Sequence, residues 1–250
     1  MISLKDKNIV VTGASSGIGK AISILCSNLG AKVLLIGRNE KNLVSVKNAC
    51  AVNDHLVLVA DITNHDLLEV DLRKALKYFG KVDGFVHSAG VEMTRPLKML
   101  KTKQLDEAMQ VNLYACINIA RILTGRGVFN DGGGSMVFIS SIAGVCGQSG
   151  KIGYGASKGA LLAAGKSLAL ELSPKRIRVN SILPAMVKTQ MSMSLINSLP
   201  LESKSKIESM HPLGLGEPED IANGVVFLLS DLTKWTTGTS MIIDGGYSAS

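Results

Sequence analysis

The sequence predicts one α/β domain built on a doubly wound parallel sheet of about seven strands, with helices on both faces. Seven short apolar runs alternate with stretches of helical periodicity along the chain. The runs are continuous and rich in β-branched residues, which is typical of strands buried on both faces. Strand–helix–strand repetition predicts parallel pairing through right-handed crossovers. The predicted strands are residues 8–13, 32–37, 56–61, 84–90, 135–141, 177–184 and 240–246.

Helical patterns fill the intervals between these strands, and one interval differs from the rest. The expected helices span residues 16–29, 40–51, 65–79, 103–125, 153–172 and 218–230. No linker divides the chain, so residues 1–250 are expected to form a single domain. Residues 186–216 have weak periodicity, with four methionines and two prolines. Such an insertion would lie over the carboxyl ends of the strands, where open α/β sheets bind ligands. We predict a mobile lid or substrate pocket here, and a plain surface excursion is the alternative.

Composition indicates an ordinary globular protein, with 46% hydrophobic and 19% charged residues among 250. The start of the chain has no apolar run typical of a signal peptide, and no later stretch approaches a membrane span, so we expect a cytoplasmic protein with no membrane partner. The net charge is +7, with basic clusters at 97–103 and 175–178. Aromatic residues do not interleave with these clusters, which argues against nucleic-acid binding. Solvated helix ends, or attraction of an anionic cofactor or substrate, are the remaining interpretations.

The four cysteines, Cys26, Cys50, Cys116 and Cys146, have no CxxC spacing and no accompanying histidine cluster. The sequence therefore predicts no metal site and fits a chain with reduced thiols. Cys26 and Cys116 fall in apolar helical patterns, where a cysteine packs as a small hydrophobic side chain.

A glycine-rich turn follows the first predicted strand in the stretch TGASSGIGK, residues 12–20. Gly13, Gly17 and Gly19 mark the passage from strand to helix with the spacing Gly-x3-Gly-x-Gly. A dinucleotide pyrophosphate needs close backbone and helix N–H groups, and side chains would block its approach. The position between a strand and a helix makes this triplet a predicted cofactor site.

The end of the second predicted strand indicates which dinucleotide binds. An acidic side chain at this point would bond the ribose hydroxyls of NAD, whereas a nearby arginine suits the 2′-phosphate of NADP. This chain has Gly37 followed by Arg38. The sequence therefore predicts a preference for NADP(H), with NAD(H) possible, and a solvent-facing arginine is the alternative.

Ser141, Tyr154 and Lys158 form a candidate catalytic group. Ser141 ends the fifth predicted strand, and its hydroxyl can hold a carbonyl oxygen. Ser140 is the competing serine, but adjacent strand residues face opposite ways. Tyr154 can donate a proton, although a free phenol has a pKa of about 10, which is high for acid–base exchange at neutral pH. Lys158 lies four residues further along the same helix face, and its charge is expected to favour the phenolate.

Taken in order, these motifs resemble those of the short-chain dehydrogenase/reductase family in its form of roughly 250 residues. The resemblance runs from Thr12 through the sequence IIDGG at 242–246 and implies a Rossmann-type fold. It selects Ser141 over Ser140 and adds Asn112, which in the family helps to hold a water linking the lysine to solvent; a packing polar group is the alternative. The implied catalytic residues are Asn112, Ser141, Tyr154 and Lys158. The implied cofactor-binding residues are Gly13, Ser15, Ser16, Gly17, Ile18, Gly19, Arg38, Asp61, Ile62, Ala89, Gly90, Tyr154, Lys158, Pro184, Val187 and Thr189.

Some of these positions carry a second interpretation or depart from the family pattern. Asp61 would contact the adenine amino group, or it could cap the next helix, a role open to Thr63 or Asn64 as well. His87 and Ser88 stand where the family usually has two asparagines, and a histidine at a strand end is more often structural than catalytic. Ala185 replaces a usual glycine, which puts in question the backbone freedom beside the nicotinamide.

The resemblance implies reversible hydride transfer between NADPH and a small carbonyl or secondary alcohol, or an acyl-carrier-bound substrate. In overall look the chain is most similar to the 3-oxoacyl-(acyl-carrier-protein) reductases, and the basic clusters could meet an acidic carrier. A dehydrogenase of a sugar, polyol or steroid alcohol is the alternative, and a cofactor-binding regulator without activity is a further one. The family's last strand packs between subunits, which implies a homotetramer, or a homodimer.

Overall fold

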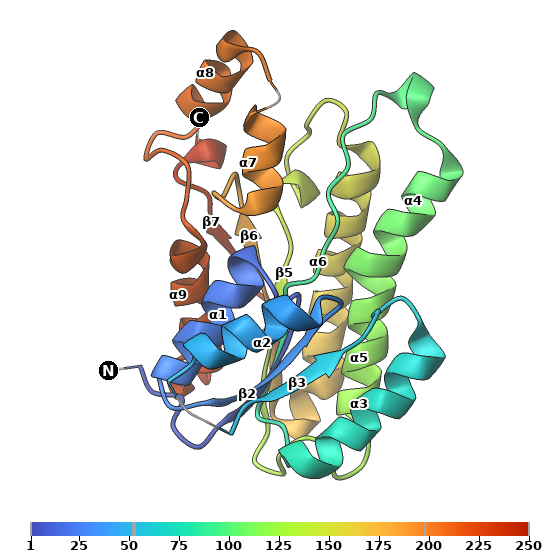
Figure 1. The fold of residues 1–250 in the computed structure, drawn as a ribbon, viewed down its shortest axis with the longest axis vertical. Helices are drawn as coiled ribbons and strands as arrows, with labels where there is room; N and C mark the ends of the chain where they lie inside the picture. The colour runs from blue at the N-terminus through green and yellow to red at the C-terminus, as the bar shows by residue number, and fades with distance from the viewer. Residues whose placement is uncertain (1, 52–53, 198, 250) are drawn as a thin grey trace.

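The computed structural model describes residues 2–51, 54–197 and 199–249. Seven parallel strands form one sheet, as the sequence predicts (Figure 1). Their order is β3-β2-β1-β4-β5-β6-β7. The order reverses between β1 and β4, and at such a switch point a crevice opens at the carboxyl ends of the strands. The strands are β1 (Asn8–Thr12), β2 (Lys32–Gly37), β3 (Leu56–Val59), β4 (Gly84–His87), β5 (Gly134–Ile139), β6 (Ile177–Pro184) and β7 (Ser240–Ile243).

Helices cover both faces of this sheet and enclose two hydrophobic cores (Figure 1). On one face lie α1 (Gly17–Asn28), α2 (Glu40–Ala49) and α9 (Pro218–Leu229). On the other lie α3 (His65–Phe79), α4 (Thr102–Met109), α5 (Ala115–Leu123) and α6 (Ile152–Leu172). Alternate residues of β1 and β2 point into the two cores, so the strands are buried on both sides. Cys26 and Cys116 are fully buried among these apolar side chains, as predicted.

Local capping explains where several helices begin. The side chain of Asn39 accepts a hydrogen bond from the backbone N–H of Asn42 and starts α2. Asn64 does the same for α3 through the N–H of Leu67. Each asparagine satisfies an N–H group that has no partner within the helix. The cap of α3 is therefore Asn64, and Asp61 is not needed for it.

The long helix predicted over residues 103–125 is interrupted. After α4 the chain forms one π-helical stretch, Gln110–Tyr114, before continuing as α5. A π turn inserts an extra residue into the helical hydrogen-bonding pattern and often marks a functional site. Asn112 lies at the centre of this stretch and is fully buried. The apolar pattern continues through the stretch, which is why periodicity alone predicted an unbroken helix.

The predicted lid forms two short helices above the carboxyl ends of the strands (Figure 1). These are α7 (Gln190–Asn197) and α8 (Leu201–Ser209), while residue 198 of the predicted segment lies outside the described residues. The two ends of the segment are joined, because Val187 and Gly216 form a parallel β-bridge. The N–H of Gly216 donates to the carbonyl of Met186 at 3.1 Å. The segment thus leaves the sheet and returns to the same point.

Two properties of the described chain bear on function. No helix in residues 2–51, 54–197 and 199–249 has both the length and the apolar character needed to span a membrane. The same residues contain no group of three or more His, Cys, Asp or Glu side chains placed to hold a metal ion.

Candidate active site

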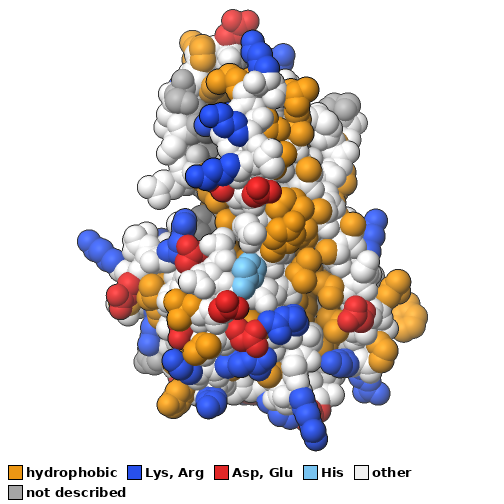
Figure 2. Space-filling view, turned by 90° about the vertical axis from the view of Figure 1, so that its right-hand side faces the viewer, with side chains coloured by type: hydrophobic (Ala, Val, Ile, Leu, Met, Phe, Trp, Pro, Cys, Tyr) orange, Lys and Arg blue, Asp and Glu red, His pale blue; other side chains and the backbone are white. Residues whose placement is uncertain are grey.

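A cavity of about 580 Å³ lies at the carboxyl ends of the strands, between the sheet and the predicted lid. In profile the molecule narrows between its upper lobe and the body built on the sheet (Figure 2). Every residue predicted for the site lines this cavity, with the exception of Asn112. The fold therefore brings together residues from seven separate segments of the sequence.

The glycine turn after β1 is shaped by close backbone contacts. Gly13 has a φ of +67°, and a Cβ atom there would lie 2.7 Å from the backbone nitrogen of Ala89. A Cβ atom on Gly19 would lie 2.2 Å from the carbonyl oxygen of Gly13. No side chain can be accommodated at such distances, so these two glycines are required by the packing of the turn itself. The turn consequently exposes bare backbone to the cavity.

The amino end of α1 is suited to a phosphate group. Ser16 is the N-cap residue, but its side chain makes no capping hydrogen bond. The first turn of α1 carries no acidic residue. Its N–H groups and the positive end of the helix dipole therefore face the cavity without a competing anion. The bare backbone cradle and this helix end fit the pyrophosphate of a dinucleotide.

Arg38 and Asp61 lie at the far end of the cavity, after β2 and β3. Arg38 is exposed, and Gly37 beside it leaves the end of β2 without a carboxylate. The carboxylate of Asp61 accepts hydrogen bonds from the backbone N–H of Thr63 at 3.0 Å and from its hydroxyl at 2.8 Å. These bonds, with a smaller effect from Arg38, hold the pKa of Asp61 below its usual value. Among the described residues that line this end of the cavity, Arg38 is the positively charged side chain.

Ser141 and Tyr154 meet at the opposite end of the cavity. The Ser141 hydroxyl is close enough to the phenol of Tyr154 to act on its pKa, and Ser141 is buried while Tyr154 is partly exposed. The hydroxyl of Ser141 also accepts from the N–H of Ala143 at 3.2 Å and lies 3.5 Å from the carbonyl oxygen of Pro184. Ser140 points elsewhere, since its hydroxyl donates to the carbonyl oxygen of Lys158 at 2.9 Å. The two strand-end serines thus face opposite ways, as expected.

Lys158 is buried, with a side-chain ammonium that donates to the carbonyl oxygen of Ile139 at 2.8 Å. Its Nζ atom lies 5.8 Å from the centroid of the Tyr154 ring. Burial lowers the pKa of Lys158 to about 8. Burial also raises the pKa of Tyr154, and this effect exceeds the lowering caused by the Ser141 hydrogen bond. The lowered phenol pKa expected from the sequence is therefore not a property of the protein alone, because desolvation outweighs the favourable neighbours.

Asn112 joins the π turn to two other segments. Its amide nitrogen donates to the carbonyl oxygen of Val91 at 3.0 Å and to the hydroxyl of Ser157 at 2.9 Å. Its side-chain oxygen accepts from the N–H of Val91 at 2.8 Å. These bonds explain the buried carboxamide without reference to catalysis. Asn112 fixes the backbone just past β4 against the start of α6.

Comparison with known proteins agrees with this geometry. Residues 13–248 match the family model described as enoyl-(acyl carrier protein) reductase. The chain belongs to the short-chain dehydrogenase/reductase family.

Curated relatives of the chain include proteins named for different substrates. The chain is 32% identical to the 3-oxoacyl-[acyl-carrier-protein] reductase FabG of Thermotoga maritima, over 97% of this chain and 98% of that one. It is 35% identical to the NAD-dependent glycerol dehydrogenase of Listeria innocua, over 98% of this chain and 95% of the relative. A putative short-chain alcohol dehydrogenase from Sinorhizobium meliloti superimposes with a TM-score of 0.92 and 29% identity, covering 100% of this chain and 99% of that chain.

His87 departs from the family pattern and is explained by a buried network. Its Nε2 atom lies 3.2 Å from the carbonyl oxygen of Val111, so Nε2 carries the proton and donates. Nδ1 then accepts from the hydroxyl of Thr12 at 3.0 Å, and that hydroxyl accepts from the N–H of Ala89 at 3.3 Å. Burial, together with the charge of Lys158, lowers the pKa of His87 to about 3. His87 is thus a neutral structural group, as the sequence indicated.

The second departure, Ala185, is also accommodated. Among the described residues, only Asp6 and Arg176 have a positive φ without being glycine. Ala185 therefore needs no glycine-like freedom. Beyond it, Thr189 is held by Ser192, whose hydroxyl accepts from the N–H of Thr189 at 2.9 Å. Val187 and Thr189 both line the cavity from this side.

Sequence reasoning missed one charged contact at the reacting end. Glu92 lines the cavity, and its carboxylate is in contact with the ammonium of Lys151. The two residues are 59 positions apart, so no spacing pattern links them. In the sequence, the only indication of this contact was that Glu92 and Lys151 are charged residues close to family motifs.

Replacing His87 with Asn is expected to make folding less sensitive to acid. The folded protein keeps His87 neutral down to about pH 3, whereas an unfolded histidine takes up a proton below its usual pKa of 6.5. The wild type therefore loses stability as the pH falls below 6.5, by about 2 kcal/mol of unfolding free energy between pH 7 and pH 5. Urea unfolding of both proteins at the two pH values measures this difference. Equal losses in the two proteins would contradict the neutral assignment.

Proposed function

We propose that the protein is an NADP(H)-dependent oxidoreductase that interconverts a carbonyl compound and an alcohol. The observation that carries the proposal is that Ser141, Tyr154 and buried Lys158 line the same cavity as the glycine turn, with the Lys158 ammonium 5.8 Å from the centroid of the Tyr154 ring. The bound nicotinamide supplies or accepts the hydride. The protein's own task is to hold the carbonyl oxygen and to move one proton.

Each residue of this group has a separate part in the proposed reaction. The Ser141 hydroxyl donates a hydrogen bond to the carbonyl oxygen and orients it. Tyr154 gives that oxygen its proton in the reducing direction and removes it in the oxidising direction. The positive charge of Lys158 stabilises the phenolate that remains, and so acts against the desolvation that raises the pKa of Tyr154. Asn112 keeps the backbone past β4 in place through Val91.

The NADP preference rests on Arg38. Its guanidinium lies at the cavity end opposite Tyr154, where the adenosine half of a dinucleotide would extend. A guanidinium can pair with a phosphate through two parallel hydrogen bonds. No carboxylate at Gly37 competes, and Asp61 already accepts two bonds from Thr63. An NAD-dependent enzyme is the second candidate, because one relative carries that name.

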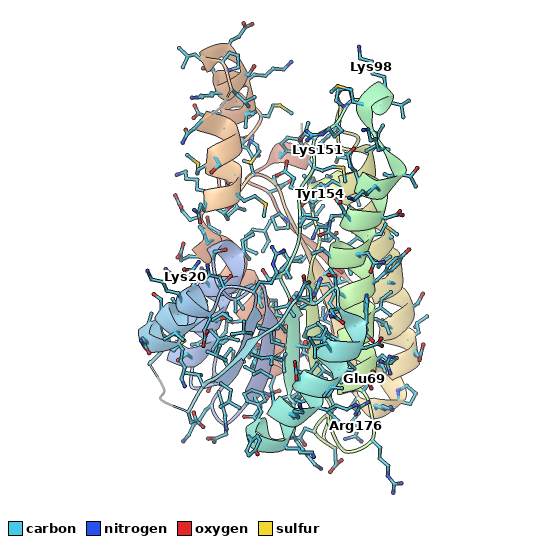
Figure 3. All side chains as sticks on the ribbon, turned by 45° about the vertical axis from the view of Figure 1, so that its right-hand side comes forward. Lys20, Glu69, Lys98, Lys151, Tyr154 and Arg176 are labelled. Carbon is cyan, nitrogen blue, oxygen red and sulfur yellow. The ribbon has the colours of Figure 1, made fainter. Side chains whose placement is uncertain are left out.

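The two basic clusters lie at opposite ends of the molecule, so they cannot both face a partner bound at the cavity. Lys98 stands at the same end as Tyr154, whereas Arg176 stands at the far end of the sheet (Figure 3). Arg178 is occupied in binding the carbonyl of Ser230 at 3.2 Å and the hydroxyl of Thr233 at 2.9 Å. We therefore propose the 97–103 cluster as the surface that meets an acidic acyl carrier at the cavity, and the position of residues 175–178 disfavours them for this role.

The remaining expectations on partners stay proposals. Basic and acidic side chains are interspersed over the face drawn in Figure 2, which supports a small-molecule partner over a nucleic acid. We further propose a cytoplasmic homotetramer or homodimer and treat α7 and α8 as a lid over the substrate. A silent cofactor-binding regulator is disfavoured, because Ser141, Tyr154 and Lys158 are all present and assembled.

Changing Tyr154 to Phe is expected to lower kcat by roughly 10²–10⁴-fold while leaving NADPH affinity near that of the wild type. The substitution removes the acidic hydroxyl and keeps the ring. Steady-state rates with a panel of ketones, followed by NADPH absorbance, measure the effect. Tyr114→Phe, at an exposed tyrosine, is the matched control. A variant that keeps more than a tenth of the wild-type kcat would rule out this role.

Changing Lys158 to Met is expected to lower both kcat and NADPH affinity, because the ammonium stabilises the phenolate and can reach the cofactor. Loss of a charge-assisted hydrogen bond corresponds to roughly 10- to 100-fold in affinity. NADPH fluorescence titration and steady-state kinetics separate the two effects. Lys166→Met, at an exposed position of the same helix, is the control. A defect in kcat alone would show that Lys158 does not contact the cofactor.

NADPH is expected to bind roughly 10- to 100-fold more tightly than NADH, and less so at high salt because Arg38 is exposed. Arg38→Ala should weaken NADPH and barely change NADH, while Lys41→Ala serves as a control on the neighbouring helix. Gly37→Asp should reverse the order by adding repulsion toward the phosphate. A Cβ atom at Gly37 has its nearest neighbour at 3.4 Å, so the substitution fits. Equal affinities in the wild type would overturn the NADP assignment.

A further inference from the structure

An ion pair stands beside the proposed catalytic tyrosine on the side away from the sheet. Glu92 follows β4 by five residues, and Lys151 immediately precedes α6. The ammonium of Lys151 contacts the carboxylate of Glu92 and lies 5.8 Å from the centroid of the Tyr154 ring. The side chains are only 15% and 21% exposed for Lys151 and Glu92. Figure 3 shows Lys151 next to Tyr154, between the helices of the proposed lid and α4.

The backbone holds both members of this pair in place. Asn112 clamps Val91, which precedes Glu92, through hydrogen bonds to its N–H and its carbonyl oxygen. On the other side, the N–H of Arg95 donates to the carbonyl oxygen of Gly150, which precedes Lys151, at 2.8 Å. The two segments that carry the charges are therefore joined to each other. Glu92 lines the cavity, and Lys151 is held directly behind it through their contact.

The pair is incompletely satisfied within the part of the chain that the structure describes. A carboxylate accepts hydrogen bonds at two oxygens, and an ammonium donates three. The contact between them is the only hydrogen bond of either side chain among these residues. The second oxygen of Glu92 and the remaining N–H groups of Lys151 are thus left to water or to a substrate. Buried charges without such partners are unfavourable.

The ion pair favours some substrate groups over others. An alkyl chain packed against the pair would displace water and return no hydrogen bond. A purely anionic group would be attracted by Lys151 and repelled by Glu92. A hydroxyl group is both donor and acceptor, so it can donate to the carboxylate while it accepts from the ammonium. The opposite wall, from α7, offers Gln190 and Ser194 together with Met191.

We propose that Glu92 and Lys151 together bind a hydroxyl group next to the reacting carbonyl, so that the substrate is a small hydroxylated ketone or the corresponding polyol. This inference rests on the proposed function, since it concerns the substrate of the same Ser141 and Tyr154. Glu92 and Lys151 determine specificity and take no part in the proton transfer.

Three ketones with equal numbers of non-hydrogen atoms test the proposal: dihydroxyacetone, 1-hydroxybutan-2-one and pentan-3-one. They carry two, one and no hydroxyl groups, and NADPH absorbance follows the reduction of each. For the wild type we expect kcat/KM to fall roughly 10- to 100-fold from the first to the last, mostly through KM, because unpaired polar groups reject the analogue that lacks a hydroxyl. Acetoacetyl-coenzyme A serves as the acyl thioester for comparison.

The double variant Glu92→Leu/Lys151→Met should reduce the three ketones with nearly equal kcat/KM, since it removes both charges together and leaves neither one unpaired. Lys166→Met, at an exposed lysine of α6 that does not line the cavity, should keep the wild-type order. A wild type that reduces all three ketones equally, or only the thioester, would overturn the inference and leave the proposed function standing. A double variant that slows all three alike, or shifts their pH profiles alike, would instead assign the pair to the electrostatics of Tyr154. No turnover of any of the four substrates would overturn both proposals.

Discussion

The reacting end of the cavity depends on one buried ammonium, that of Lys158. A buried cation is unfavourable unless its hydrogen bonds are made, and here the Ile139 carbonyl oxygen at 2.8 Å supplies one. The backbone packs closely against it on one side, because a Cβ atom on Gly90 would lie 3.3 Å from the ammonium nitrogen. Ser140 ties the backbone of Lys158 to the end of β5. The ends of β4 and β5 and the start of α6 are therefore positioned around a single charge.

A second buried base, His87, is neutral, because the same buried environment disfavours another positive charge. Burial and the neighbouring charge of Lys158 both disfavour a second cation, so the imidazole is neutral. Neutrality lets Nδ1 accept from Thr12, and Thr12 in turn accepts from the N–H of Ala89. Ala89 lies directly against Gly13 of the phosphate turn. The charge at one end of the cavity is in this way linked through packing and hydrogen bonds to the backbone cradle at the other.

Periodicity and spacing in the sequence were sufficient to predict those features that depend on neighbouring residues alone. Buried parallel strands require continuous apolar runs, and the turn after β1 tolerates no Cβ atom at Gly13 or Gly19, so both features are visible in the residue types. Tertiary effects were not visible. The π turn around Asn112 changes the backbone bonding within an unchanged apolar pattern. The raised pKa of Tyr154 results from burial by residues distant in the sequence. The role of Arg178 depends on the carboxyl end of α9, whose Ser230 carbonyl it binds. The contact of Glu92 with Lys151 joins two loops that only the complete fold brings together.

One end of the cavity is formed mainly by backbone groups and the other mainly by side chains. This difference explains why the first could be predicted from the sequence and the second could not. The end that we propose for the cofactor consists of backbone N–H groups and of glycines without side chains, so few residue types are compatible with it. The end that we propose for the substrate consists largely of side chains from the segment after β4 and from α7, neither of which belongs to the sheet. Relatives that are 32–35% identical, and are named for acyl thioesters or for glycerol, fit that division. Glu92 combines a fixed backbone with a variable side chain. Its neighbour Val91 is hydrogen-bonded to Asn112, while the Glu92 carboxylate faces the cavity. A change of side chain at Glu92 can therefore alter the proposed substrate contact while the bonds of Asn112 to Val91 and Ser157 keep the backbone of this segment fixed against α6.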